Sequence, residues 1–342
     1  MKKKALITGV TGQDGAYLAR FLLDQGYQVF GAYRRSATLD TSRLDYLGIT
    51  DDVEFVAFDL LEFSNIVRTL EQCKPDEIYN LAAQSFVALS FEQPLYTSDV
   101  DGQGVLRILE AIRLLGMEKS TKFYQASTSE MFGKVKETPQ TEDTPFHPRS
   151  PYGVAKLFAH WANINYRESY GLFGCNGILF NHESPLRGLE FVTRKITHKL
   201  AHMATHGGEP LELGNMEAKR DWGFAGDYVK GMWLMLQQDN PDDYVLATGQ
   251  TYTVKEFVNL SAAALDIQLD WVGEGVNTQA INRKSGEVVV KVNPEFYRPS
   301  EVDLLLGDSS KAKSQLGWEP ETTLSELVTM MVEADLKRVS KI

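Results

Sequence analysis

Short apolar runs alternate with longer amphipathic stretches through about residue 180 of the chain. Short apolar runs are typical of buried strands, whereas apolar residues that recur every three to four positions indicate helices. We predict strands at 5–7, 28–33, 53–60, 77–85, 122–127 and 175–180. We predict helices directly after residue 15 and at about 102–115 and 152–169. This alternation predicts an α/β fold with a doubly wound parallel sheet and right-handed crossovers.

Beyond residue 183 the pattern becomes irregular, with scattered helices. One helix is predicted at 191–206. Two more are predicted from capping boxes, Thr-x-x-Glu at 253–256 and at 323–326, because the threonine and glutamate side chains satisfy the first backbone N–H groups of a helix. Since no flexible linker intervenes, we predict a large domain at 1–183 and a smaller mixed α/β lobe at 184–342, with some chain exchange between them.

The chain carries a formal net charge of −11 over 342 residues, which argues against nucleic acid or an anionic membrane as its main partner. An anionic substrate then requires a local cationic cluster. Candidates are Arg187, Arg194, Lys195, Lys219, Arg220, Arg283, Lys284 and Arg298. Two cysteines cannot form a disulfide framework or a metal site, which favours a reducing compartment. With no apolar run near membrane-spanning length, we predict a cytoplasmic protein.

A glycine-rich turn follows the first strand, with Gly9, Gly12 and Gly15 spaced three apart. Glycines allow the backbone to approach a pyrophosphate, and a helix N-terminus offers free N–H groups to it. The second strand ends in Arg34, Arg35 and Ser36, where an NAD-binding site usually has an acidic residue. Two guanidinium groups favour a 2′-phosphate and hence NADP, although a pair of solvated arginines is the alternative.

Ser150 and Pro151 are predicted to be the cap and first residue of a helix. Tyr152 and Lys156 then lie four residues apart, on one helical face. We expect the lysine charge to lower the pKa of the tyrosine, so that its phenolate can take a proton from an alcohol as hydride leaves. Taken alone, such a pair is more often a surface tyrosine and a solvated lysine, because short motifs match by chance. The strand at 122–127 delivers Thr128 and Glu130 to the same sheet edge.

Five separated blocks resemble extended short-chain dehydrogenases/reductases that act on nucleotide sugars, and within them the GDP-mannose 4,6-dehydratases. The blocks are Thr-Gly-Gln-Asp-Gly at 11–15, Gln-Ala-Ser-Thr-Ser-Glu-Met-Phe-Gly at 125–133, Gly-Ile-Leu-Phe-Asn-His-Glu-Ser-Pro at 177–185, Ala-Lys-Arg-Asp-Trp-Gly at 218–223 and Tyr-Arg-Pro-Ser-Glu-Val-Asp at 297–303. The resemblance covers almost the whole chain. It implies a Rossmann-like NADP-binding domain, a GDP-sugar-binding lobe and a homodimer or homotetramer.

The resemblance also implies roles for individual residues, with no metal. The catalytic residues are Thr128, Glu130, Tyr152 and Lys156. The cofactor-binding residues are Gly9, Thr11, Gly12, Gln13, Asp14, Arg34, Arg35, Ser36, Asp59, Leu60, Leu81, Ala82, Ala83, Gln84, Ser85, Tyr96, Lys156, His182 and Arg187. The substrate-binding residues are Ser85, Asn181, Lys195, Arg220, Arg283, Arg298 and Glu301.

The implied reaction is oxidation at C4 of the hexose, loss of water across C5 and C6, and return of hydride to C6. Glu130 serves as base and then as acid, which requires a pKa raised towards neutrality by desolvation. Three alternatives stay open: the same chemistry on a GDP-manno-heptose, with or without a following 4-keto reduction; a nucleotide-sugar 4-epimerase or reductase; and an NADP-sensing regulator without catalysis. The segment at 270–295 departs most from the family pattern, so the sugar is the least constrained part of this prediction.

Overall fold

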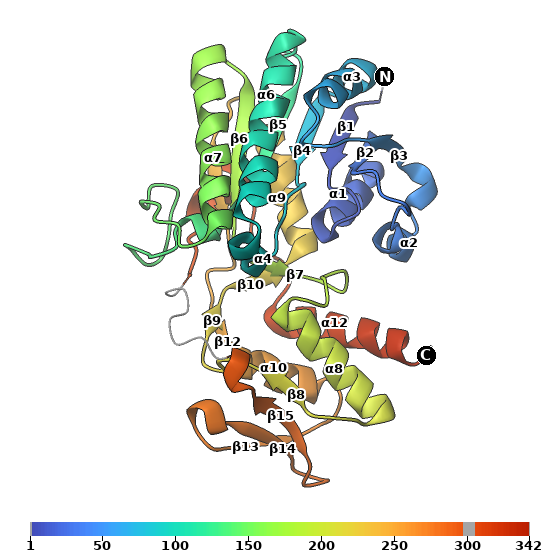
Figure 1. The fold of residues 1–342 in the computed structure, drawn as a ribbon, viewed down its shortest axis with the longest axis vertical. Helices are drawn as coiled ribbons and strands as arrows, with labels where there is room; N and C mark the ends of the chain where they lie inside the picture. Colours follow the sequence, from blue (N-terminus) through green and yellow to red (C-terminus); the bar gives the residue numbers. More distant parts are fainter. Residues whose placement is uncertain (1, 297–304, 342) are drawn as a thin grey trace.

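The computed structural model describes residues 2–296 and 305–341. Within these ranges, seven parallel strands form the central sheet in the order β11-β6-β5-β4-β1-β2-β3 (Figure 1). Their bounds are β1 Lys4–Thr8, β2 Gln28–Tyr33, β3 Glu54–Ala57, β4 Glu77–Asn80, β5 Lys122–Thr128, β6 Phe173–Leu179 and β11 Asp243–Leu246. The strand order reverses between β1 and β4, the place at which a doubly wound sheet opens a crevice for a ligand. The predicted parallel, doubly wound sheet is confirmed.

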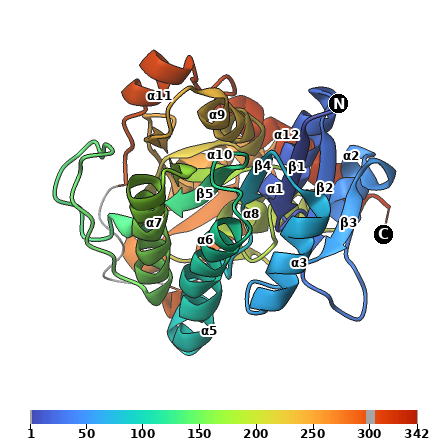
Figure 2. The ribbon, with the colours of Figure 1, turned by 90° about the horizontal axis from the view of Figure 1, so that it is seen from above.

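Helices cover both faces of this sheet (Figure 2). One face carries α3 (Phe63–Cys73), α6 (Gly104–Leu114) and α7 (Pro151–Tyr170). The other carries α1 (Gln13–Asp24) and α9 (Ala225–Gln237). Shorter helices α2 (Ser42–Leu47), α4 (Val87–Glu92) and α5 (Pro94–Ser98) lie in the connections. Among the described residues, no helix is both long enough and apolar enough to cross a membrane.

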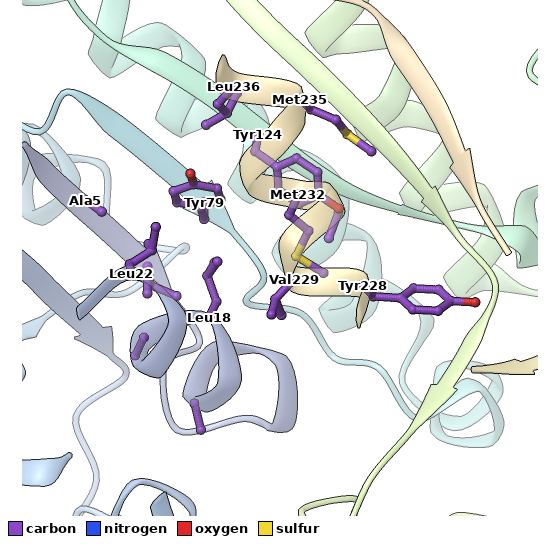
Figure 3. Close-up of a cluster of buried hydrophobic side chains, with 14 of the residues drawn as sticks. Ala5, Leu18, Leu22, Tyr79, Tyr124, Tyr228, Val229, Met232, Met235 and Leu236 are labelled. Atoms are coloured by element: carbon purple, nitrogen blue, oxygen red, sulfur yellow. The ribbon is translucent and has the colours of Figure 1, made fainter. Parts of the chain in front are cut away.

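The core between α1, α9 and the sheet shows why these segments fold as they do (Figure 3). Leu18 and Leu22 lie four residues apart on α1 and are fully buried. Met232 and Met235, from α9, belong to the same buried cluster, as does Tyr79 of β4. Each such side chain contributes about 1.5–3 kcal/mol on burial, so the apolar stripe on α1 is sufficient to seat that helix on the sheet.

Several elements beyond residue 184 pack on the large sheet rather than in the smaller lobe. Strand β11 pairs with β6 in parallel, α9 packs on α1, and α11 (Ser310–Leu316) contacts β11. The smaller lobe is built around a sheet in the order β13-β14-β15-β8. Its bounds are β8 Leu211–Leu213, β13 Leu269–Val272, β14 Gln279–Asn282, β15 Val288–Val292, α8 Val192–His206, α10 Val254–Ala263 and α12 Leu324–Val339.

Two small ladders join the units, β7–β10 in parallel and β9–β12 antiparallel. Their bounds are β7 Asn181–Glu183, β9 Lys219–Arg220, β10 Trp222–Phe224 and β12 Tyr252–Thr253.

The helix starts predicted from capping residues are confirmed, whereas α1 begins at Gln13, earlier than predicted. Both capping boxes form, with each threonine hydroxyl accepting the N3 backbone N–H and each glutamate accepting the N-cap N–H. At α7, the Ser150 hydroxyl accepts the N–H of Gly153 at 3.0 Å, and Pro151 is the first helical residue. This cap determines where α7 begins, and therefore where Tyr152 and Lys156 lie.

Candidate active site

A cleft of about 1220 Å³ lies along the carboxyl edge of the central sheet. Its walls come from residues that follow β1, β2, β4, β5 and β6, and from the loop before α8. In a parallel sheet these carboxyl ends are the place at which ligands bind. The cleft is therefore the candidate active site.

The glycine turn brings two backbone segments into close contact at one end of the cleft. Gly9 has φ +70°, and a Cβ there would lie 3.0 Å from the backbone of Ala82. A Cβ on Gly15 would lie 2.3 Å from the carbonyl oxygen of Gly9. Only glycine permits this packing, and the turn leads directly into the N-terminus of α1. The turn therefore forms a cradle suited to a pyrophosphate.

The loop after β2 provides cationic and polar groups at the far end of the same cleft. Arg34 and Ser36 line it, and Nη1 of Arg34 donates a hydrogen bond to the hydroxyl of Tyr96. Asp40 also lines the cleft, but its carboxylate accepts the backbone N–H of Ser42 at 3.0 Å. Arg35, predicted to bind the cofactor, is not a lining residue.

The tyrosine and lysine of α7 are both buried at the cleft floor. Tyr152 is 8% exposed and Lys156 is 4% exposed. Nζ of Lys156 donates to the carbonyl oxygen of Ala126 at 3.0 Å and lies 5.8 Å from the centroid of the Tyr152 ring. The hypothesis of an exposed tyrosine and a solvated lysine is excluded.

The expected lowering of the Tyr152 pKa is wrong for the protein alone. Burial raises the pKa of Tyr152 above its usual value, and the charges of Asp101 and Glu130 raise it further. The Thr128 side chain and Arg187 act in the opposite direction but do not overcome these effects. Burial also lowers the pKa of Lys156, which weakens that residue as a cation. Local spacing predicted the lysine effect, whereas desolvation and two more distant acids decide the net result.

Thr128 and Glu130 lie where β5 ends. The hydroxyl of Thr128 accepts the backbone N–H of Glu130 at 3.2 Å, and both side chains line the cleft with Tyr152. Burial raises the pKa of the Glu130 carboxyl, although the charge of Arg220 opposes this rise. The predicted direction of the Glu130 pKa is confirmed. A carboxyl of this kind can both accept and return a proton near neutral pH.

A partly buried ion pair connects the glycine turn with β7. Nε2 of His182 lies 2.7 Å from Oδ2 of Asp14, and Nδ1 lies 2.7 Å from the carbonyl oxygen of Phe180. Because both ring nitrogens face oxygen acceptors, the imidazolium form is favoured. Burial would lower the pKa of His182, but the Asp14 charge and these hydrogen bonds raise it overall. Asp14 is thereby held in contact with β7, across the cleft from α7.

Comparison with known proteins identifies the family. The family model for GDP-mannose 4,6 dehydratase matches residues 6–331. The GDP-mannose 4,6-dehydratase of Vibrio cholerae is 56% identical over 98% of this chain and 95% of its own length. The chain belongs to the GDP-mannose 4,6-dehydratase family. The human GDP-mannose 4,6 dehydratase is 51% identical over 97% of this chain and 91% of its own length.

Solved structures share the fold of this dehydratase family member at lower identity. The UDP-glucose 4-epimerase of Thermotoga maritima, solved with UDP-glucose, gives a TM-score of 0.82 at 24% identity, covering 99% of this chain and 100% of that one. The dTDP-glucose 4,6-dehydratase DesIV of Streptomyces venezuelae, solved with NAD and TYD, gives a TM-score of 0.82 at 20% identity. The match covers 99% of this chain and 98% of that one. The Rossmann-like architecture is thus common to both.

The structure brings most of the expected site residues of this family together. All four expected catalytic residues line the cleft, as do all the expected cofactor residues other than Arg35. Of the expected substrate residues, Ser85, Asn181 and Arg220 line it. Arg298 and Glu301 lie outside the described residues.

Two expected substrate residues lie elsewhere. Lys195, on α8, lies with its Nζ 4.5 Å from the centroid of the Phe296 ring. Arg283 is exposed beside the β13–β14 hairpin, with its guanidinium 2.7 Å from the Asp270 carboxylate. Arg194, also in the cationic set, is buried in an ion pair with Asp335 at 2.7 Å. Positive charge in the sequence therefore identified Arg220 but did not distinguish it from structural arginines.

The sequence analysis missed an aromatic pair at the cleft. Phe86 and Phe191 both line the cleft, and their ring centroids lie 6.3 Å apart in an edge-on contact. The guanidinium of Arg187 lies 3.5 Å from the centroid of the Phe191 ring and pairs with Glu183 at 3.0 Å. Isolated aromatic residues in loops carry no periodic signal, so only the fold reveals that these two meet.

Proposed function

We propose that the chain converts GDP-mannose into GDP-4-keto-6-deoxy-mannose by an internal redox cycle with bound NADP. Membership of the GDP-mannose 4,6-dehydratase family supports the substrate and the overall dehydration. The observation that carries the mechanism is a buried carboxyl, Glu130, in the same cleft as the Tyr152–Lys156 pair. A simple reductase or a 4-epimerase requires the pair but has no use for the carboxyl.

The first chemical step removes a proton from the C4 hydroxyl and a hydride from C4. Tyr152 takes the proton of the C4 hydroxyl, and Thr128 donates a hydrogen bond to the same oxygen as negative charge develops there. NADP, when bound, accepts the C4 hydride and later returns it to C6. Lys156 stabilises the phenolate form of Tyr152, in a cleft where burial otherwise disfavours that form.

The second step is elimination. The C4 ketone makes the C5 proton acidic because the resulting carbanion is an enolate. Glu130 removes that proton and then protonates the departing C6 hydroxyl, so that water leaves. Its raised pKa suits both halves of this task. When hydride has returned to C6, C5 takes up a proton from solvent and Tyr152 releases to solvent the proton that it took from the C4 hydroxyl, which restores the starting state of both residues.

The preference for NADP is proposed from the loop after β2. Arg34 lines the cleft next to Ser36 and is held by Tyr96, as expected of a group that binds a 2′-phosphate. We expect Arg34→Ala to weaken NADP⁺ binding by about 10- to 100-fold, as for a lost charge-assisted contact, with NAD⁺ binding little changed. Arg35→Ala is the matched control, because this neighbour does not line the cleft. Isothermal titration with both cofactors measures the effect. An equal loss for NAD⁺ and NADP⁺ would contradict the proposal.

Mass spectrometry of GDP-mannose incubated with the protein and a trace of NADP⁺ in deuterated water tests the function. We expect loss of one water, one deuteron retained at C5 and no accumulation of NADPH. Unchanged GDP-mannose would contradict the proposed substrate, and GDP-heptoses would then be assayed in the same way. Deuterium exchange without loss of water would contradict the role of Glu130.

We also propose that the protein works as a homodimer or homotetramer. Supporting this, α7 presents Val154, Phe158 and Trp161 to solvent at helical spacing, with exposures of 56%, 44% and 56%. Leu95 of α5, 83% exposed, borders the same hollow as Val154 and Phe158. Exposed apolar patches such as this one, on α5 and α7, are typical of subunit interfaces.

Trp161→Glu is expected to convert the oligomer to monomers at micromolar concentration, because a carboxylate cannot be desolvated in an apolar interface without cost. Light scattering coupled to size exclusion measures the mass. Val272→Glu is the control, since Val272 is similarly exposed but lies on the β13–β14 hairpin. An unchanged mass for the Trp161 variant would place the interface elsewhere.

A further inference from the structure

Asp101 is a buried acid beside the active site that the proposed reaction does not use. It is 1% exposed and lies in a π-helical segment, Asp99–Gln103, between α5 and α6. Single π-helical turns of this kind often occur at functional sites. The segment packs on α7: a Cβ on Gly102 would lie 3.5 Å from the carbonyl oxygen of Ala155. Asp101 therefore adjoins the helix that carries Tyr152 and Lys156.

Only half of the Asp101 carboxyl is satisfied by hydrogen bonds. Oδ1 accepts the backbone N–H of Gln84 at 2.7 Å, which ties Asp101 to the loop that lines the cleft after β4. Oδ2 is buried and has no hydrogen-bond partner among the described residues. A buried carboxylate in this condition requires a nearby cation or a proton. If this side chain only had to accept the N–H of Gln84, a neutral amide or hydroxyl oxygen would be sufficient.

Lys156 is the cation that acts on this carboxyl. Its charge lowers the pKa of Asp101, as does the Gln84 N–H, but burial is stronger and raises that pKa to about 6. Arg107, which is nearer in sequence, instead pairs with Asp99 at 2.6 Å. The carboxyl of Asp101 is thus placed to change its charge within the range of pH in which enzymes work.

The interaction also acts on the residues of α7. The Asp101 charge raises the pKa of Lys156, with a smaller contribution from Asp14. It is the largest charge effect on Tyr152, followed by that of Glu130, while Arg187 acts in the opposite direction. The protonation states of Asp101, Lys156 and Tyr152 are therefore coupled, because all three groups are buried and little water screens their charges.

We propose that Asp101 is a positioning residue that anchors the Gln84 loop and holds a buried carboxyl in the segment packed against α7, and so sets the protonation of the Tyr152–Lys156 pair. The proposal rests on the proposed roles of that pair. When Asp101 is negative, it stabilises the lysine cation and disfavours the phenolate. When Asp101 is neutral, the phenolate forms more readily. The acid–base pair is thereby matched to pH by a residue that does not touch the substrate.

Asp101→Asn separates the charge from the hydrogen bond, because an amide oxygen can still accept the N–H of Gln84. We expect the limb of the pH profile of kcat/KM that depends on Tyr152 to move about one pH unit lower, since removal of a nearby like charge favours the anion. The KM for GDP-mannose should stay unchanged. Asp99→Asn, two residues away, removes an exposed charge paired with Arg107 and should leave the profile as in the wild type. A wild-type profile for Asp101→Asn, with the protein folded, would overturn the proposal.

A second measurement follows the holoenzyme directly and does not depend on turnover. The ring carbon that bears the hydroxyl of Tyr152 can be followed by NMR in tyrosine-labelled protein, with Tyr152→Phe to assign the signal. We expect a step in its chemical shift near pH 6, where Asp101 titrates, and no such step in Asp101→Asn. If the chemical shift of the wild-type signal does not change through this range, Asp101 does not control the protonation of Tyr152. The proposed dehydration is tested separately, by the deuterium experiment.

Discussion

Glu130→Gln is expected to abolish loss of water while oxidation at C4 continues. The amide cannot accept the C5 proton, and general acid–base catalysis of this kind contributes about 10²- to 10⁴-fold to a rate. Tyr152, Lys156 and Thr128 stay in place, so one equivalent of 4-keto sugar and NADPH should form and persist. NADPH absorbance in a single turnover and deuterium uptake at C5 measure the two steps separately.

Glu142→Gln is the matched control for this variant. Glu142 is another glutamate whose pKa burial raises, but its carboxylate accepts the N–H of Val245 at 2.7 Å and does not line the cleft. Its amide analogue should keep full activity because it can accept the same hydrogen bond. If Glu130→Gln also dehydrates GDP-mannose at the wild-type rate, the carboxyl is not the base, and the proposed mechanism is wrong at its central step.

Tyr152→Phe is expected to stop the reaction earlier, before any NADPH forms. Without the hydroxyl no group takes the C4 proton as hydride leaves, and we expect a loss of about 10³-fold or more in the hydride-transfer rate. The ring still fills its place on the cleft floor, so NADP⁺ binding should stay within a few-fold of the wild type. Stopped-flow NADPH absorbance and a cofactor titration check these two expectations.

Tyr166→Phe controls for the loss of a buried hydroxyl from the same helix. Tyr166 also lies on α7 and is largely buried, but its hydroxyl bonds to Glu110, away from the cleft. It should cost stability rather than catalytic rate. Normal hydride transfer in Tyr152→Phe, or an equal loss in both variants, would refute the assignment of Tyr152 as the proton acceptor.

Local sequence rules were sufficient for the sheet and for the start of α7. A parallel strand is buried on both faces and therefore appears as a continuous apolar run, and a Ser-Pro pair caps a helix through its own side chain and fixed φ. These effects act within a few residues, so the positions of Thr128, Tyr152 and Lys156 followed from them. The role of Glu130 came instead from family resemblance, whereas the glycine turn and Arg34 were interpreted from their own chemistry.

Local sequence rules could not predict which distant segments and side chains come together in the fold. The sequence pattern beyond 184 did not show that β11 would pair with β6 in the large sheet. It also could not tell Arg220, which lines the cleft, from Arg283, which pairs with Asp270 on a distant hairpin. Each of these outcomes depends on which surfaces meet after the chain has folded, and side-chain charge carries no such information.

By itself, the sequence determined the strands and most of the longer helices up to about residue 180, the residues that reach the carboxyl edge of the sheet, and the family. The tertiary structure alone decided the electrostatics of the site. The lysine four residues from Tyr152 predicted an easily ionised phenol, yet burial and the charges of Asp101 and Glu130 raise its pKa. The physical reason is that helical spacing is a local property, whereas desolvation and Coulomb energy depend on every group that the fold packs around a site.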